Sequence, residues 1–178
     1  MSGIVRLFSS RWWCGSLLLA MLAGCASDPT QGYSTATVFR TDVATVAVPI
    51  FANDTLHRDI EFELTDALVK EIERRTPYKV SPEIRADTIL TGQVRYVELD
   101  PLSKSASTGL TEELIVRVTV DFQWTDLRTN ERLMERRTFE GTSLAVPSAP
   151  SSEPLEVGQF AVVQQLARDI VDEMQAEW

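Results

Sequence analysis

The sequence predicts an α+β domain: a two-layer sandwich in which two amphipathic helices cover one face of a mostly antiparallel sheet of four or five strands. Three observations predict it. Helical periodicity occurs in segments 58–75 and 156–174, near the two ends of the domain. Strand-like segments lie between them, and segment 113–125 alternates strictly between apolar and polar residues. Such alternation indicates a sheet buried on one face only, which the helices then cover.

The first half of the domain begins with a strand at 43–48, rich in β-branched residues and ended by Pro49. The helix at 58–75 follows, and Thr76-Pro77 ends it because a residue before proline disfavours helical geometry. A short edge strand is expected around 78–80. The apolar residues that recur at helical spacing, and so should be buried, are Ile60, Leu64, Ala67, Leu68 and Ile72.

The second half continues with a strand at 87–99, a serine-rich loop at 101–109 and the alternating strand at 113–125. In the first of these strands, Leu90, Val94 and Tyr96 should face the core, and Gly92 should lie where a packed helix comes close. A hairpin turn at 126–130, with Asn130 at positive φ, leads to a returning strand at 133–139.

An irregular crossover around 143–155 precedes the last helix, since it contains three prolines and several serines. The apolar stripe expected on that helix consists of Phe160, Val163, Ala167, Ile170 and Met174, extended by Trp178.

The N-terminus reads as an export segment. Arg6 and Arg11 precede a short apolar stretch, and residues 22–25 (LAGC) match the lipobox of bacterial lipoproteins. That match implies a signal peptide at 1–24, a diacylglycerol on the sulfur of Cys25, a tether at 25–42 and a domain at 43–178. Without an aspartate after the cysteine, we expect the periplasmic side of the outer membrane. The alternative is an ordinary signal peptide with a chance cysteine.

Charge and residue usage argue against several classes of function. The formal net charge of −9 disfavours general nucleic-acid binding. His57 is the only histidine and lacks a second histidine or cysteine as a co-ligand, so a solvated loop position is expected for it. Serine-nucleophile motifs and phosphate-binding loops are absent from the sequence. We therefore expect no catalysis, no metal and no cofactor.

The polar face of the predicted sheet is the candidate binding surface. Gln93, Arg95, Arg117 and Gln123 should lie on it, and two arginines on neighbouring strands can form a positive spot. Such a spot suits an anionic amphiphile or a partner β-structure. The alternative is a solvated face on which Arg117 pairs with Asp121 or with a cross-strand acid.

Three segments carry a family resemblance: residues 46–55 (VAVPIFxNxT), 60–68 (IExxLTxAL) and 86–92 (ADTILTG). They resemble the LptE family of lipopolysaccharide-assembly lipoproteins, in a divergent form. The resemblance implies a sandwich of two helices and four strands, and a plug inside the outer-membrane β-barrel LptD that assists lipopolysaccharide delivery. It leaves open whether lipopolysaccharide is bound directly. Similar openings occur in other envelope lipoproteins, so a secretion-pore subunit or a peptidoglycan-synthase activator remains an alternative.

Overall fold

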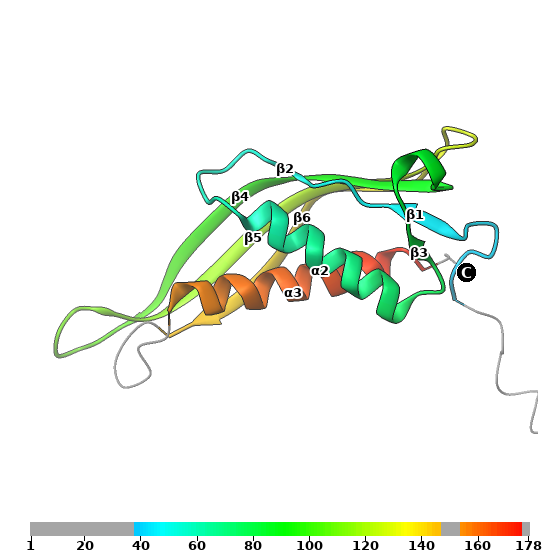
Figure 1. Cartoon of the computed structure of the whole chain (residues 1–178). Coiled ribbons are helices and arrows are strands. Elements are labelled where there is room, and N and C mark those ends of the chain that lie inside the picture. The colour runs from blue at the N-terminus through cyan, green and yellow to red at the C-terminus, as the bar shows by residue number, and fades with distance from the viewer. Residues whose placement is uncertain (1–37, 147–153, 176–178) are drawn as a thin grey trace, which may run out of the picture. The chain divides into compact units, whose positions relative to one another are not determined.

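A computed structural model of the chain describes residues 38–146 and 154–175 (Figure 1). The expectations for the signal peptide, Cys25 and most of the tether fall on residues 1–37 and lie outside this part. Trp178 and the middle of the crossover, 147–153, lie outside it as well.

Within the described residues, the elements alternate much as the sequence predicts, and the α+β class is confirmed. The two α-helices are α2 (Ile60–Arg75) and α3 (Leu155–Glu173), joined by a short 3-10 helix, η2 (Glu83–Arg85), and by strands. The strands are β1 (Thr45–Ala47), β2 (Ala52–Asn53), β3 (Lys79–Val80), β4 (Thr88–Lys104), β5 (Thr111–Asp126) and β6 (Arg132–Ala145).

The strands of the described part form a single sheet in the order β3-β1-β4-β5-β6, with β2 paired to β4 beside β1, so the sheet has six strands. The three long strands are antiparallel, whereas β1, β2 and β3 pair in parallel. The sequence missed β2 because two residues are too few to show any alternation.

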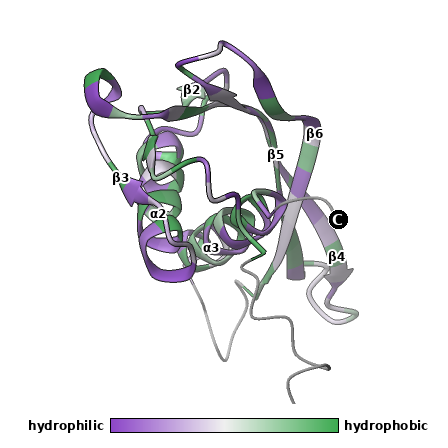
Figure 2. Ribbon diagram, turned by 90° about the vertical axis from the view of Figure 1, so that its right-hand side faces the viewer, coloured by the Kyte–Doolittle hydropathy of each residue, from purple (hydrophilic) through white to green (hydrophobic). Residues whose placement is uncertain are grey.

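Both helices lie on the same side of the curved sheet (Figure 2). The α2 residues predicted to be buried are all in the core, and they meet Leu90 and Val94 from β4 and the inward residues of β5. Burial of these side chains is the main stabilising contribution, at about 25 cal/mol per Å² of apolar surface. The opposite face of the three long strands remains without a covering layer in the described part.

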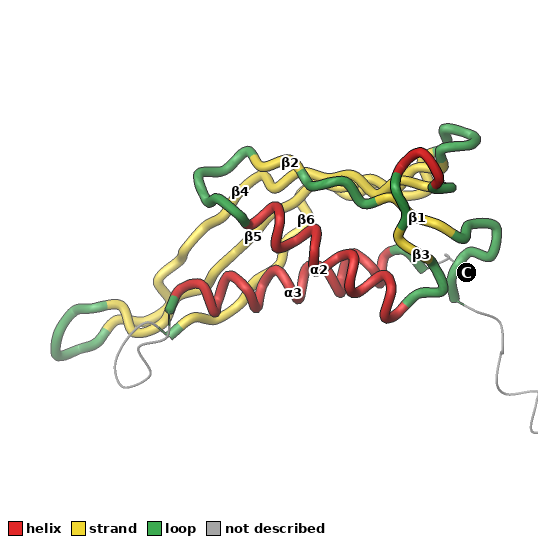
Figure 3. Tube along the Cα trace, viewed as in Figure 1, coloured by secondary structure: helices red, strands yellow, loops and turns green. Residues whose placement is uncertain are grey.

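The long strands extend beyond the helices at one end (Figure 3). There β4 continues through Pro101 to Lys104 before the chain turns, so the prediction of a loop at 101–109 is wrong for its first residues. Likewise β6 continues to Ala145 instead of ending near 139. The extension of β4 contains no buried residue, whereas the extension of β6 packs on α3 through Gly141 and Ala145.

A bulge in β4 changes which residues face the core. Val94 pairs with Val120 but Tyr96 pairs with Thr119, so Arg95 is an extra residue. Tyr96, predicted to be buried, is 58% exposed, while Val97 takes the inward position. Alternation with period two cannot anticipate this shift, because one inserted residue reverses the facing of all that follow.

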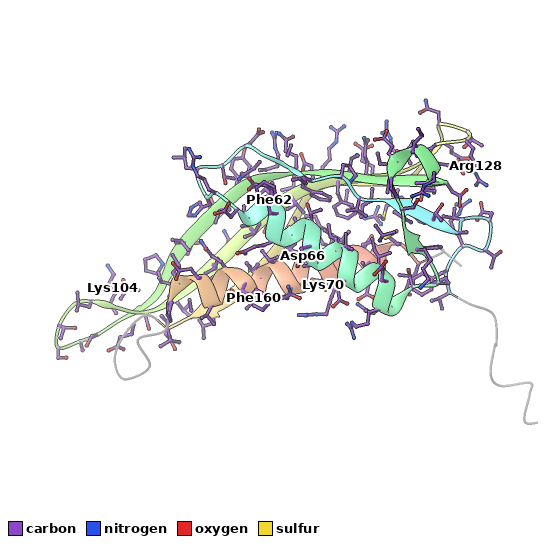
Figure 4. All side chains as sticks on the ribbon, viewed as in Figure 1. Phe62, Asp66, Lys70, Lys104, Arg128 and Phe160 are labelled. Atoms are coloured by element: carbon purple, nitrogen blue, oxygen red, sulfur yellow. The ribbon has the colours of Figure 1, made fainter. Side chains whose placement is uncertain are left out.

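Two further expectations differ in detail. Phe160 was predicted to belong to the core, but it is 58% exposed on α3 (Figure 4). The buried stripe of α3 contains Val162, and Phe160 stands about 200° around the helix from that residue. Gly92 contacts the ring of Phe51 rather than a helix, since a Cβ there would lie 2.2 Å from Phe51 Cε2. Asn130 adopts positive φ (57°), as predicted.

Candidate functional site on the open face of the sheet

The open face of the sheet is hollowed over β4, β5 and β6. One hollow of about 300 Å³ adjoins a second one of about 340 Å³, and the two share Thr91 and Gln123. We call them together the open-face groove. Its lining side chains are mostly polar. The first hollow is lined by Ala52, Thr91, Gly92, Gln93, Asp121, Phe122, Gln123, Glu135, Arg136 and Arg137.

Strand pairing places two of the predicted residues in this groove. Gln93 pairs with Asp121, and Thr91 pairs with Gln123, across β4 and β5. These residues alternate with core residues along both strands, so their side chains project away from the helices. Arg117 lies on the same face farther along β5, opposite Glu98.

Arg95 is held at the bulge by acids on both sides. Its Nη1 donates to Asp54 Oδ2 at 2.9 Å and to Gln93 Oε1 at 3.3 Å, while its Nε lies 3.6 Å from Asp121 Oδ2. The guanidinium therefore links the loop after β2 to the centre of the sheet.

Arg117 is also surrounded by carboxylates. Its Nη1 lies 3.4 Å from Glu98 Oε2 and 3.4 Å from Asp100 Oδ2. Pairing with a cross-strand acid, one of the two alternatives from the sequence, is thus what the structure has. Each arginine is matched by two carboxylates, so the local charge is negative and not a positive spot. A ligand or partner role for Gln93, Arg95, Arg117 and Gln123 stays a prediction.

Asp121 fixes a strained residue of the neighbouring strand. Its Oδ1 accepts a hydrogen bond of 2.8 Å from the backbone N–H of Thr138. Thr138 has φ of 55°, a left-handed conformation that is rare for a β-branched residue. A bulge lies here because Val120 pairs with Phe139 whereas Phe122 pairs with Arg136. Nothing in the sequence indicates this bulge, since the usual residue at such a φ is glycine and not threonine.

The β6 side of the groove carries charged side chains that the sequence pattern does not point to. Arg137 Nε donates to Glu135 Oε1 at 2.9 Å, and Arg132 pairs with the same carboxylate. These two guanidinium groups, Arg137 first, hold the pKa of Glu135 below its ordinary value. The Arg137 side chain is 78% exposed at the rim, where a ligand or partner can reach it.

Residues 51–61, which connect the first two of the family-like segments, stabilise the fold. Of these residues only Ala52 lines the groove. The amide nitrogen of Asn53 donates to His57 O and to Glu61 Oε2, both at 2.7 Å. Its oxygen accepts from the backbone N–H of Thr55 at 2.8 Å. Asn53 thus ties β2 to the first turn of α2, which explains the spacing of the motif.

Asp87, the aspartate of the segment 86–92, also stabilises the fold. Asp87 Oδ2 accepts from the N–H groups of Ala44 and Thr45, both at 3.0 Å, and from the Thr45 hydroxyl at 2.9 Å. These donors, the Ala44 N–H first, lower the pKa of Asp87. The carboxylate therefore joins the start of β4 to β1.

His57, the only histidine of the sequence, lies next to Gln159 of α3. His57 is half-buried in the loop before α2, and its Nδ1 lies 3.4 Å from Gln159 Nε2. Within 38–146 and 154–175, no group of three or more His, Cys, Asp or Glu residues is arranged to hold a metal ion. In the same ranges, no helix has the length and apolar character needed to cross a membrane.

Comparison with known proteins gives a family match. A sequence model described as LptE, lipopolysaccharide-assembly, matches residues 43–177. No curated protein matches the sequence significantly.

Solved structures share the fold. Protein XCC0632 from Xanthomonas campestris has a TM-score of 0.59 and 12% identity, covering 80% of this chain and 88% of that one. The PelC dodecamer from Paraburkholderia phytofirmans has a TM-score of 0.52 and 18% identity, covering 80% of this chain and 96% of that one. At such identities the likeness concerns the fold alone.

Proposed function

Because the chain belongs to the LptE lipopolysaccharide-assembly family, we propose that it is an outer-membrane lipoprotein that associates with the β-barrel LptD and assists lipopolysaccharide transport. The observation that carries the proposal is the family match over 43–177, which spans nearly the whole predicted domain. In this proposal the protein acts by binding, without catalysis, metal or cofactor.

The architecture supports a binding role. Two helices close one face of the sheet, whereas the other face keeps a polar groove whose side chains are fixed by ion pairs. A pre-organised surface of this kind loses little conformational entropy when a partner docks on it.

The lipid anchor is the second part of the proposal. A cysteine in the LAGC context at Cys25 would carry a diacylglycerol and, after cleavage, a further acyl chain on its amine. Each buried methylene contributes about 0.8 kcal/mol, so several chains anchor the protein stably. A Cys25→Ser variant should stay uncleaved and leave the outer membrane; normal processing and location of that variant would contradict the anchor.

The decisive experiment is affinity purification of the full-length protein, tagged at its C-terminus, from detergent-extracted outer membranes. A large β-barrel should co-purify at a constant ratio with the parent protein. The Cys25→Ser variant, expressed at a matched level, serves as the control for location. Recovery of the parent as a lone species would contradict the proposed association.

The predicted polar face is tested in the same purification. Arg95→Ala with Arg117→Ala removes the two arginines predicted for that face, and barrel recovery and binding of purified lipopolysaccharide are then measured. A matched control is Arg40→Ala, because Arg40 is also ion-paired, to Asp42 at 2.9 Å, but lies away from the groove lining. If barrel recovery and lipopolysaccharide binding are the same for the double variant and for Arg40→Ala, then Arg95 and Arg117 do not belong to the partner surface.

A second candidate, a secretion-pore subunit, is favoured by the shared fold with the PelC dodecamer. A pore subunit should assemble into rings, so the mass of the detergent-extracted protein separates the two candidates. A peptidoglycan-synthase activator, the remaining alternative, should instead co-purify with such a synthase.

A further inference from the structure

The outer edge of β6 is an open sheet edge. Within the described part of the chain, β6 pairs with β5 on one side and with no strand on the other. The unpaired N–H and C=O groups of such an edge can hydrogen-bond to another strand. Proteins commonly prevent this with charges, prolines or bulges, so the distribution of those features along β6 is informative.

The first part of β6 carries these protective features. Its bulge at Thr138 interrupts the regular pairing with β5. Its charged residues are Arg132, Glu135, Arg136, Arg137 and Glu140. A partner strand would have to follow the bulge and cover these charges, so pairing there is disfavoured.

The last five residues of β6, Gly141–Ala145, lack every one of these features. The segment contains neither charge nor proline, and it pairs with Leu114–Val118 without a register shift. Leu144, on the open face, is 51% exposed. We call Gly141–Ala145 the neutral edge segment.

The outer edge of β4 makes a useful contrast. Beyond its pairing with β2 at Val94, this strand is also without a further neighbour in the described residues. That stretch includes Glu98, Asp100, Pro101 and Lys104. A proline and several charged residues protect this edge, so the neutral edge segment differs from it and from the first part of β6.

A second copy of the chain is a poor occupant. Five residues per copy are far fewer than the about 20–30 residues per side of a stable interface. The chain also carries a formal net charge of −9, so two copies repel each other. The segment fits better as one element of a larger contact with a different protein that the lipid anchor keeps nearby.

We propose that the neutral edge segment is where an extended, uncharged segment of the β-barrel partner, lying outside the closed wall of the barrel, adds to this sheet as a strand through main-chain hydrogen bonds. The inference rests on the proposed function, because that function supplies the barrel. Main-chain pairing provides the affinity, and side chains on alternate positions provide the specificity.

The side chains around the segment define what the added strand must carry. On the open face, Leu144 lies beside its register partner Ile115, and an apolar residue of the partner can pack on this pair. On the helix face, α3 presses closely on the small residues of β6. A Cβ on Gly141 would lie 2.6 Å from Leu166 Cγ, and one on Gly158 would lie 2.8 Å from Ala145 Cβ.

Hydrogen exchange on the purified complex of the full-length protein and its barrel tests the pairing directly. Compared with the full-length protein alone, outward amides of Gly141–Ala145 should exchange about tenfold or more slowly, whereas the outer edge of β4 should change little. Exchange that is already slow in the isolated protein would overturn the proposal, because the edge would then be covered by the chain itself.

Variants that add a charge to the neutral edge segment provide a second test of the pairing. Thr142→Lys and Leu144→Lys place a cation on the neutral edge segment and should lower barrel recovery about tenfold, equivalent to about 1.4 kcal/mol. Ile84→Lys adds the same charge at a 93% exposed position on η2, away from β6 and from the groove lining, and should leave recovery unchanged. Thermal unfolding of each variant shows that it is folded.

The outcomes separate the inference from the function on which it rests. Suppose that the parent protein co-purifies with the barrel, but hydrogen exchange at 141–145 is not slowed in the complex and the lysine variants there do not lower barrel recovery. Only the edge pairing is then contradicted. If no barrel is recovered with the parent, both fail. A dimeric mass of the parent that Leu144→Lys reduces to a monomer would also overturn the inference, because the occupant would be a second copy.

Discussion

Asp121 and Thr138 form a cross-strand contact that combines a hydrogen bond with backbone strain. The carboxylate on β5 accepts the N–H of Thr138 at 2.8 Å, and Thr138 holds φ at 55° in the bulge of β6. A left-handed conformation costs roughly 1–2 kcal/mol in a residue with a Cβ. The bulge therefore depends on the contact with Asp121, and it shapes the rim of the open-face groove.

Removing the acceptor should destabilise the fold. We expect Asp121→Ala to lower the free energy of unfolding by about 1–2 kcal/mol, and Asp121→Asn by less, since its oxygen still accepts. Thr138→Gly should recover part of the loss in the Asp121→Ala background, because glycine adopts this φ freely. Urea unfolding measures all three. Gln123→Ala on the same strand is the control, and an equal loss there would contradict the role of the contact.

Acid should weaken the link between β1 and β4. The pKa of Asp87 is lowered in the fold by the N–H of Ala44 and the groups of Thr45, relative to about 3.9 in an unfolded chain. A lowered pKa means that its stabilisation is complete above the unfolded value and is lost as the pH falls through the folded value. Stability should thus decline below about pH 4, more steeply in the parent than in Asp87→Asn. Identical pH profiles for the two proteins would contradict this prediction.

Gly92 should not tolerate a side chain. A Cβ there would lie 2.2 Å from Phe51 Cε2 and 2.8 Å from the backbone oxygen of Asp121, so alanine must displace the Phe51 ring or the strand. We expect Gly92→Ala to cost about 1–3 kcal/mol, as overpacking does. A second substitution, Phe51→Leu, should relieve part of the clash. Thermal unfolding of the two single variants and the double variant gives the coupling.

Asn53 is half-buried, and its replacement by aspartate should destabilise the fold. Its amide nitrogen donates to Glu61 Oε2 and His57 O, whereas a carboxylate would donate to neither and would repel Glu61. We expect Asn53→Asp to cost about 1–3 kcal/mol, with part of it recovered in Asn53→Asp with Glu61→Gln. Chemical denaturation of the single and double variants tests this, and additive losses would show that the two side chains are not coupled.

The errors in predicting the candidate site arise because sequence patterns are short-range, whereas the contacts at the site join distant segments. Gln93 and Gln123 could be placed on the open face because alternation persists through that part of β4 and β5. The pairing of Arg95 with Asp54 was not predictable, since the bulge and the loop after β2 bring those residues together from 41 positions apart. Arg137 was missed because its place at the groove depends on the bulge beside Thr138.

The sequence by itself determined the helices, the long strands, the hairpin turn at Asn130 and the family. Each of these depends on local periodicity, on turn residues or on contiguous motifs. The tertiary structure alone decided the two-residue strand β2, the facing of Tyr96 and Phe160, the charge balance around Arg95 and Arg117, and the unprotected edge at Gly141–Ala145. The physical reason is that bulges, strand order and ion pairs arise from contacts between distant segments. A period of 2 or 3.6 residues carries no information about such contacts.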